Sequence, residues 1–381
     1  MNSLEDFLQR HVQAGTLPGA VALVAHGDHV EVEAAGSVDT AGSAPMARDS
    51  IFRIASITKP IVAAALLRLV EDGQIGLHDP VERWLPELAK PVVVRTPDAP
   101  VDDVVPADRS ITVADLLTFR TGYGFPSDFS LPQVQQLAAV QKDGRHPATF
   151  PAPDEWIAAL GRIPLLYQPG QMWLYDTSGT IQGILISRIT GTPLQDALTE
   201  RIFEPLGMVD TDFHIPESKR HRFTSYYEPE PDGRLRLVDP PDGQWSNPPA
   251  LPLGNGGLVS TVDDWHAFAR MLLGHGTLDG RRVLSGESVR AMTTNQLTPA
   301  QRAASGLFLG AQGWGYGGSV DIEPTNPWNV PGRYGWVGGT GTSAYLVPAT
   351  DSVAILLTQV GVTSPVAPSW QEDFWRHASR H

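Results

Sequence analysis

The segment Pro60–Val70 is apolar on nearly every face, and it limits the possible folds more than any other part of the chain. A helix that lacks a polar side is normally buried in the middle of a protein. The chain has 381 residues, 41% of them apolar, which is enough to enclose such a helix in a sizeable core. We therefore expect one large domain, or two interleaved ones, around a central helix.

Hydrophobic periodicity places strands near both ends of the chain and helices between them. Strands are expected at Ala20–Ala25, Val30–Ala35, Ser343–Val347 and Val353–Thr358, with a hairpin turn at Gly27–His29. Further helices are expected at Leu4–Val12, Ile181–Ile189, Leu194–Phe203, Val262–Leu273 and Trp370–His377. Ser260 or Thr261 is expected to cap the fourth of these helices, with Asp263 or Asp264 in the reciprocal position. The pattern predicts a mixed α/β (α+β) fold whose sheet takes strands from both termini, with a helical region inserted between them.

Composition excludes several functional classes. The net charge of −14 argues against nucleic acid and anionic membrane surfaces as partners, because both repel an acidic protein. The absence of cysteine excludes thiol catalysis and disulfides, and the scattered histidines contain no His-Glu-x-x-His motif, so no metal site is expected. No stretch approaches the ~20 apolar residues of a membrane span. Met1–Phe7 lacks the basic and apolar parts of a signal peptide, so a cytoplasmic location is the expectation.

Ser56 and Lys59 directly precede the central helix in a Ser-x-x-Lys spacing. Residues three apart share a helix face, so the lysine amine is expected beside the serine hydroxyl. A hydroxyl becomes a good nucleophile when a neighbour takes its proton, and burial can lower the pKa of a lysine enough for it to do so. A capping serine and a solvated lysine at a surface helix start are the alternative. The catalytic interpretation is favoured because lysine is scarce in this chain; the four lysines are Lys59, Lys90, Lys142 and Lys219.

The segment Phe52–Pro60 resembles the nucleophile segment of the serine β-lactamase and penicillin-binding protein superfamily. More narrowly, it resembles the family VIII carboxylesterases, which have a class C β-lactamase fold. The resemblance extends over nearly the whole chain. Leu17–Ala20 is similar to the family's opening strands, Asp115–Gly122 to the segment leading into its helical domain, and Gly256–Thr261 to the return from that domain.

The resemblance also implies a domain organisation. It implies an antiparallel sheet flanked by helices, with residues 1–81 and 255–381 in an α/β domain and residues 82–254 in an inserted, mainly helical domain. It implies no metal and no other cofactor. The oligomeric state stays open.

The family's second motif is Tyr-x-Asn, and its counterpart here is Tyr175–Thr177. The family's tyrosine shuttles a proton between nucleophile and leaving group, so the resemblance implies that role for Tyr175. A phenol is a weak acid and would need a cation such as Lys59 to serve as a base near neutral pH. A core tyrosine with a satisfied hydroxyl is the structural alternative. Thr177 replaces the asparagine, so the substrate contact expected at Thr177 lacks an amide.

The family's third motif, Lys-Thr-Gly, is replaced by Trp336–Gly338, which resembles the Trp-Gly-Gly form of the esterase branch. The family's lysine binds a substrate carboxylate and supports the tyrosinate, and we expect a tryptophan to do neither. An indole offers apolar stacking surface instead. Trp336 and Gly338 are therefore expected to bind neutral esters rather than the carboxylate of a β-lactam or peptide. By analogy, the amides of Ser56 and Gly339 are expected to form the oxyanion hole.

Together these residues predict a serine carboxylesterase that cleaves short-chain or aryl esters, small-molecule substrates, by two-step acyl transfer. Ser56 attacks the carbonyl, Lys59 and Tyr175 manage its proton, and water then releases the acid. Which of Lys59 and Tyr175 is the base stays open, because their protons are coupled. A β-lactamase or D-Ala-D-Ala peptidase, a small-amide hydrolase and an acyltransferase are alternatives on the same site. A catalytically silent scaffold with this fold is the alternative from another class.

Overall fold

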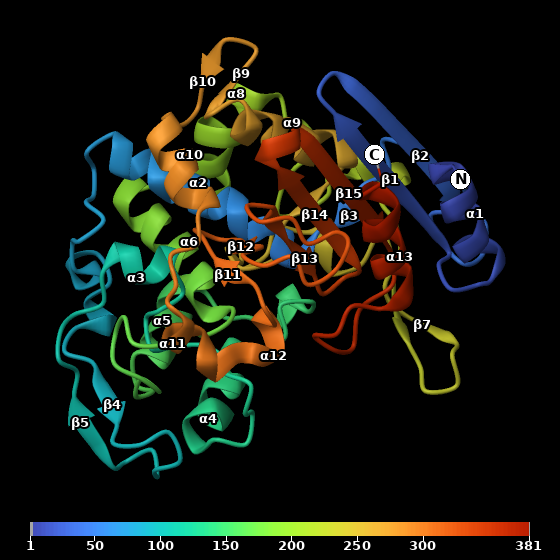
Figure 1. Ribbon diagram of the computed structural model, residues 1–381. Helices are drawn as coiled ribbons and strands as arrows, with labels where there is room; N and C mark the ends of the chain where they lie inside the picture. The colour runs from blue at the N-terminus through green and yellow to red at the C-terminus, as the bar shows by residue number, and fades with distance from the viewer. Residues whose placement is uncertain (1–2, 381) are drawn as a thin grey trace.

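The computed structural model describes residues 3–380 and contains a seven-stranded sheet of order β11-β12-β13-β14-β15-β1-β2 (Figure 1). Every neighbouring pair in it is antiparallel. Ala20 in the N-terminal part pairs with Thr358 near the other end, so the expected sheet from both termini is confirmed. The strands are β1 (Gly19–His26), β2 (His29–Gly36), β11 (Gly313–Trp314), β12 (Ser319–Val320), β13 (Tyr334–Gly338), β14 (Thr342–Val347) and β15 (Ser352–Thr358).

Both faces of this sheet are covered, which explains why β1 is apolar along most of its length. Successive side chains of a strand point to opposite faces. Ala20, Ala22 and Val24 pack with helices α1 (Leu4–Gln13) and α13 (Ser369–Ala378) on one face. The residues between them, Val21, Leu23 and Ala25, belong to the main core on the other face. Figure 1 shows α1 and α13 together on the outer side of the sheet.

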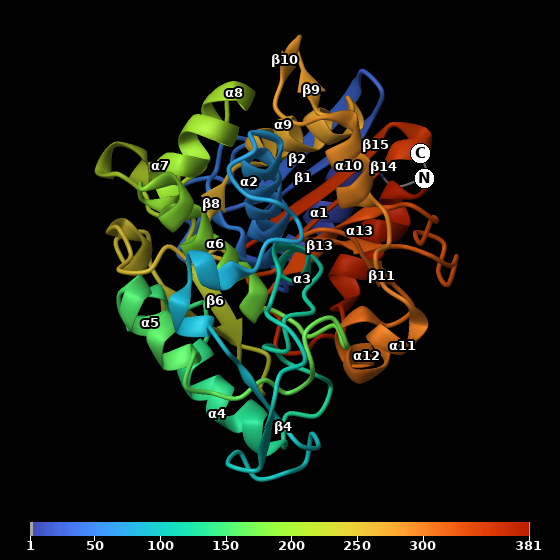
Figure 2. The ribbon, with the colours of Figure 1, turned by 90° about the vertical axis from the view of Figure 1, so that its left-hand side faces the viewer.

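Helix α2 (Lys59–Glu71) fulfils the expectation for the apolar segment Pro60–Val70. Its residues from Lys59 to Leu67 are all buried, and it packs against α6 (Thr177–Thr190) in the interior (Figure 2). A short 3-10 turn, Ala55–Thr58, leads into it. Ser56 therefore lies in the turn that leads directly into this buried helix.

The middle of the chain is mainly helical, as expected, but it also contains two small ladders. Its helices are α3 (Val113–Leu117), α4 (Pro132–Gln141), α5 (Pro153–Leu160), α6, α7 (Leu194–Leu198) and α8 (Glu204–Leu206). The ladders pair β4 (Val92–Val94) with β5 (Val104–Pro106), and β6 (Tyr226–Pro229) with β7 (Leu235–Asp239). The segment expected as one helix at Leu194–Phe203 is α7 followed by a π-helical turn, Thr199–Phe203.

The main hydrophobic core joins the two predicted domains. Ile61 of α2 and Ile181 of α6 belong to the same cluster of buried side chains, so the predicted insertion shares its core with the sheet domain. The boundaries at residues 81/82 and 254/255 stay a prediction. Residues 1, 2 and 381 of the predicted α/β domain lie outside the described range.

Of the remaining strands and helices, β3 (Phe52–Arg53) precedes α2 and the others lie between the insertion and β11. These others are β8 (Val259–Ser260), α9 (Val262–Leu273), β9 (Thr277–Leu278), β10 (Arg281–Arg282), α10 (Gly286–Thr293), α11 (Pro299–Arg302) and α12 (Gly306–Leu309). Within residues 3–380, no helix is both long enough and apolar enough to cross a bilayer.

The cap of α9 is confirmed in one half and wrong in the other. The Thr261 side chain accepts a hydrogen bond from the Asp264 amide at 3.2 Å. The expected reciprocal bond is absent from the cap, because the Asp264 carboxylate instead accepts from the Asp210 amide and the Thr211 hydroxyl, each at 2.8 Å. Asp263 binds Arg48 on the surface.

Candidate active site

The backbone just before Ser56 is held in an unusual conformation. Ala55 has a φ of +44°, in the left-handed region that residues with a side chain adopt at a cost of about 1–2 kcal/mol. Thr340, in the turn between β13 and β14, donates a hydrogen bond to the Arg53 carbonyl at 2.5 Å, and Thr342, the first residue of β14, donates to the Ile54 carbonyl at 2.8 Å. These two bonds fix the residues just before Ser56. Neither threonine carries a prediction from the sequence. The nucleophile segment is therefore locked onto the last part of the sheet.

Gly338 and Gly339 lie against this locked segment. A Cβ at Gly338 would come within 2.5 Å of the Ile54 carbonyl oxygen, so only glycine fits there. Within residues 3–380, neither the Gly339 amide nor the Ser56 amide donates to a protein acceptor. Both N–H groups are thus available to a substrate oxygen, and their role as the oxyanion hole stays a prediction.

The structure brings Ser56, Lys59 and Tyr175 into mutual contact. Lys59 Nζ donates to Ser56 Oγ at 2.7 Å, and the Tyr175 hydroxyl lies 2.9 Å from Ser56 Oγ. Lys59 Nζ is also 3.5 Å from the Tyr175 oxygen. Three side chains from a 3-10 turn, the start of α2 and the segment before α6 therefore meet at one hydroxyl.

The pKa of Lys59 is raised, so the expectation that burial would lower it is wrong. Its side chain is fully buried, which disfavours the charged form, but the Asp176 carboxylate at 2.7 Å and the Tyr175 oxygen outweigh burial and raise the pKa of Lys59 above its ordinary value. Asp176 carries no prediction from the sequence, because it occupies the unspecified middle position of the Tyr-x-Asn pattern.

Trp336 contacts the tyrosine directly, which corrects a second expectation. Its indole N–H donates to the Tyr175 oxygen at 2.8 Å, so this tryptophan does support negative charge on that oxygen. Phe308 of α12 stacks on the Tyr175 ring with centroids 4.7 Å apart. From the sequence the indole is expected only as an apolar surface, and Phe308 carries no prediction.

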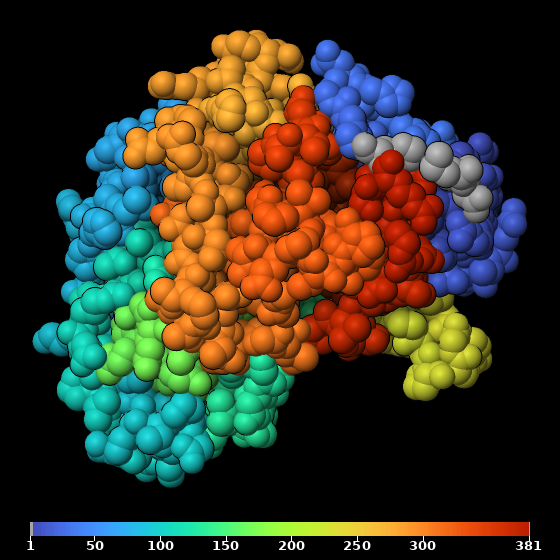
Figure 3. Space-filling view, viewed as in Figure 1, coloured from blue at the N-terminus to red at the C-terminus, as the bar shows by residue number. Residues whose placement is uncertain are grey.

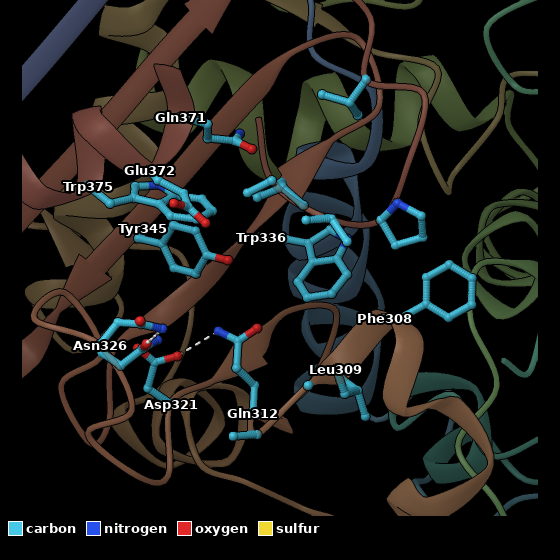
Figure 4. Close-up of a pocket in the computed structure, with 18 of the residues that line it drawn as sticks. Phe308, Leu309, Gln312, Asp321, Asn326, Trp336, Tyr345, Gln371, Glu372 and Trp375 are labelled. Atoms are coloured by element: carbon cyan, nitrogen blue, oxygen red, sulfur yellow. Dashed lines mark hydrogen bonds between the residues drawn. The ribbon is translucent and has the colours of Figure 1, made fainter. Parts of the chain in front are cut away.

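A cavity of about 680 Å³ opens beside these residues. The chain near residues 300–330 and the C-terminal segment, which lie side by side on one face of the molecule, contribute most of its lining (Figure 3). Figure 4 shows Trp336 and Phe308 on one side of the cavity and Gln371, Glu372 and Trp375 on the other. Tyr175, Gly338 and Gly339 also line it, whereas Ser56 and Lys59 adjoin it through Tyr175.

Thr177 is the predicted site residue that the structure does not bring to this cavity. It begins α6, is fully buried, and its hydroxyl has no hydrogen-bond partner within residues 3–380. The preceding residue, Asp176, has a φ of +80° and turns its carboxylate to Lys59. The substrate contact expected at Thr177 therefore has no geometric support. No group of three potential metal ligands occurs within residues 3–380.

Comparison with known proteins gives the same assignment as the geometry. The family model described as Beta-lactamase matches residues 4–373. Protein Rv1367c of Mycobacterium tuberculosis is 38% identical over 91% of this chain and 86% of its own length. Esterase EstB of Burkholderia gladioli is 30% identical over 92% of this chain and 88% of its own length.

Among solved structures, EstCE1, described as a hydrolase with promiscuous acyltransferase activity, superposes with a TM-score of 0.82. It covers 98% of this chain and 97% of its own, at 21% sequence identity, so this likeness concerns the fold. The predicted β-lactamase-like fold is thereby confirmed. With the family match over almost all of its length, the chain belongs to the Beta-lactamase family and is a serine hydrolase of the β-lactamase superfamily.

Proposed function

We propose that this protein hydrolyses neutral carboxylic esters through an acyl-enzyme on Ser56. The observation that carries the proposal is the hydrogen bonding of one serine hydroxyl by both Lys59 Nζ (2.7 Å) and Tyr175 Oη (2.9 Å) beside a cavity edged by Trp336. A hydroxyl in such contacts can lose its proton as it attacks a carbonyl carbon.

The proton of Ser56 passes to the Tyr175 oxygen in this proposal. That oxygen faces the Trp336 N–H at 2.8 Å and Lys59 Nζ at 3.5 Å, two donors that stabilise its anionic form before attack. Ser56 Oγ then bonds to the carbonyl carbon, and the carbonyl oxygen takes the negative charge against the amides of Ser56 and Gly339.

Collapse of the tetrahedral intermediate completes the first half of the reaction. The bond from carbonyl carbon to alkoxy oxygen breaks, Tyr175 returns its proton to the leaving alcohol, and an acyl group remains on Ser56. Water then attacks the acyl carbon and gives its proton to Tyr175, which hands it back to Ser56 as the free acid leaves.

The charges around the cavity favour neutral substrates. Its cationic lining residues are already paired: Arg333 with Asp321 at 3.3 Å, and Arg145 with Asp143 and Glu228. Within residues 3–380, no unpaired cation is therefore present in the lining to bind a substrate carboxylate. This supports esters over β-lactams and peptides, which carry that group.

The shape and rim of the cavity favour an apolar or aryl part in the substrate. Phe308 and Trp336 form one wall, and two lining side chains, Leu307 and Val366, are 43% and 69% exposed. Exposed apolar side chains beside a cavity are typical of a binding site for apolar groups. The relative named esterase, EstB, agrees with this choice of reaction.

Acyl transfer to an alcohol is the second candidate. A cavity of about 680 Å³ has room for an acceptor alcohol beside the acyl-enzyme, and EstCE1 is described as having promiscuous acyltransferase activity. In that reaction the alcohol replaces water in the second step, and the products are a new ester and the regenerated Ser56.

Hydrolysis of p-nitrophenyl acetate and butyrate tests the proposal, with a chromogenic cephalosporin and an added alcohol as further arms. We expect ester turnover that falls at least about 10³-fold in Ser56→Ala, together with little cephalosporin cleavage. Asp263→Asn, at a surface ion pair with Arg48, is the matched control and should keep wild-type turnover.

Two results would overturn the proposal. Equal ester turnover by wild type and Ser56→Ala would show that Ser56 is not the nucleophile. Preferential cleavage of the cephalosporin would show that neutral esters are not the preferred substrates. A new ester formed faster than free acid in the presence of the alcohol would replace hydrolysis by acyl transfer.

A further inference from the structure

The ammonium of Lys59 has three N–H donors, and the structure gives each of them a close acceptor. The acceptors are Ser56 Oγ at 2.7 Å, the Asn255 carbonyl at 2.6 Å and the Asp176 carboxylate at 2.7 Å. A neutral amine has only two N–H groups, so it would keep all three contacts only by accepting the Ser56 proton, and it would then face the Asp176 carboxylate at 2.7 Å without a positive charge. The arrangement therefore matches the charged form of Lys59.

Asp176 is itself held by two amide side chains. Asn255 Nδ2 donates to Asp176 Oδ2 at 2.7 Å, and Gln141 Nε2 donates to the same oxygen at 3.1 Å. The amide oxygens of Asn255 and Gln141 are buried and have no hydrogen-bond partner within residues 3–380. Both amides thus direct their N–H groups to the carboxylate and leave their own oxygens without a hydrogen bond, so the carboxylate is held from two separate segments of the chain.

The backbone supports the same conclusion. Asp176 has a φ of +80°, a conformation that residues other than glycine rarely adopt, although aspartate tolerates it better than most. Asp176 directly follows Tyr175 in the chain, and this backbone conformation turns its carboxylate toward Lys59, whose side chain is fully buried. Strain of this kind persists where surrounding contacts fix it.

We propose that Asp176 is a positioning residue that keeps Lys59 charged and aims its ammonium at Ser56. Its effect on ester turnover rests on the proposed function, whereas its effect on the protonation of Lys59 does not. Asp176 and Tyr175 are the titratable groups that face Lys59 within residues 3–380. Without the carboxylate, burial would be the dominant influence on the lysine, and burial favours the neutral amine.

The scarcity of lysine makes a direct test practical. The chain has four lysines, so selective ¹³C/¹⁵N labelling gives four side-chain signals, and the signal lost in Lys59→Arg is that of Lys59. In wild type the Lys59 signal should titrate above the ordinary lysine value of about 10.4. In Asp176→Asn the midpoint should move to lower pH by at least about one unit.

Ester turnover supplies a second readout that a purely structural residue would not change. In Asp176→Asn the alkaline limb of kcat/KM should shift to lower pH together with the Lys59 signal, and the loss should appear in kcat rather than KM. Asp176→Glu, which keeps the charge, should restore part of the wild-type profile. Asp263→Asn again serves as the matched control, because it removes a carboxylate from a surface pair remote from Ser56.

An unchanged Lys59 titration in folded Asp176→Asn would overturn the inference. If that variant does not fold, the wild-type titration decides: a Lys59 midpoint below the ordinary value would overturn the inference, and one above it would support it. Failure of the proposed function is distinguishable, because it would leave wild type without ester turnover while the Lys59 titration still responds to Asp176.

Discussion

Two buried ion pairs flank the nucleophile, and they differ in what else they contact. Arg53 pairs with Asp239, and both side chains are almost completely buried. The guanidinium also donates to the Thr224 and Pro240 carbonyls and lies 4.0 Å from the centre of the Phe223 ring. All of these partners belong to the protein core or to its connecting loops, and none of them is Ser56, Lys59 or Tyr175.

The pair of Lys59 with Asp176, in contrast, contacts the nucleophile directly and is partly exposed to solvent. Lys59 gives one of its three donors to the Ser56 hydroxyl, and Asp176 is 20% exposed. Attraction by Asp176 and Tyr175 outweighs burial and raises the pKa of Lys59, whereas burial outweighs Asp239 and lowers the pKa of Arg53. The comparison indicates that the Arg53–Asp239 pair holds the nucleophile segment in place, whereas the Lys59–Asp176 pair acts on the Ser56 hydroxyl itself.

The largest effect is expected for Lys59→Met, which removes the ammonium but keeps an unbranched side chain of similar length. Turnover should fall at least about 10³-fold, because Ser56 and Tyr175 both lose their cation. Steady-state ester hydrolysis, with folding checked by circular dichroism, measures this. Lys219→Met is the matched control, since Lys219 also lies 2.8 Å from a carboxylate, that of Asp210, but away from Ser56. Near-normal turnover by Lys59→Met would break the comparison.

Arg53→Met should affect stability instead of chemistry. It leaves the Asp239 carboxylate buried without its cation, which typically costs about 3–5 kcal/mol of unfolding free energy. The activity of the molecules that remain folded should stay within about 10-fold of wild type. Urea unfolding gives the first quantity, and active-site titration with a serine-reactive phosphonate gives the second. Arg48→Met, at the exposed pair with Asp263, should change stability by at most about 0.5 kcal/mol.

Asp264 shows what happens to a buried carboxylate without a directly bound cation, and the smallest effect is expected there. Burial raises its pKa to about 6, despite hydrogen bonds from Thr211 and the Asp210 amide. Between about pH 4 and 6 the folded protein therefore binds more protons than the unfolded chain, and stability falls as the pH rises through this window.

Asp264→Asn should flatten that part of the pH dependence and change the difference in unfolding free energy between pH 5 and pH 8 by about 1–2 kcal/mol. Urea unfolding at the two pH values measures it. An unaltered slope in the variant would show that Asp264 does not carry a shifted proton. Asp263→Asn, on the same helix turn but exposed, should leave the slope as in wild type.

The sequence was most informative where local spacing determines contact. Ser56 and Lys59 are three residues apart at the start of an apolar helix, so their contact follows from helix geometry. The strands and helices at the two ends of the chain were also found, because each has a clear apolar period. Tyr175 was placed through its motif, and the structure brings it to Ser56.

The sequence was least informative where contacts join distant segments. Gln141 and Asn255 reach Asp176 from α4 and from the chain before β8, and no local pattern links them. Asp176 itself could have been suspected, because a buried lysine that stays charged needs an anion nearby and Asp176 directly follows the motif tyrosine. The Trp336 error has another cause: an indole was counted as apolar surface, although its N–H is a donor.

The order of strands in the sheet has a consequence for biosynthesis. A ribosome makes β1 and β2 long before β15, the strand that pairs with the other edge of β1. Until then the nascent hairpin offers an unpaired strand edge that a chaperone, or another copy, could occupy. Gly339 is also synthesised long after Ser56, so a growing chain carries the serine before the second amide of the predicted oxyanion hole exists. The predicted oxyanion hole therefore forms only after β13 and the residue that follows it have left the ribosome.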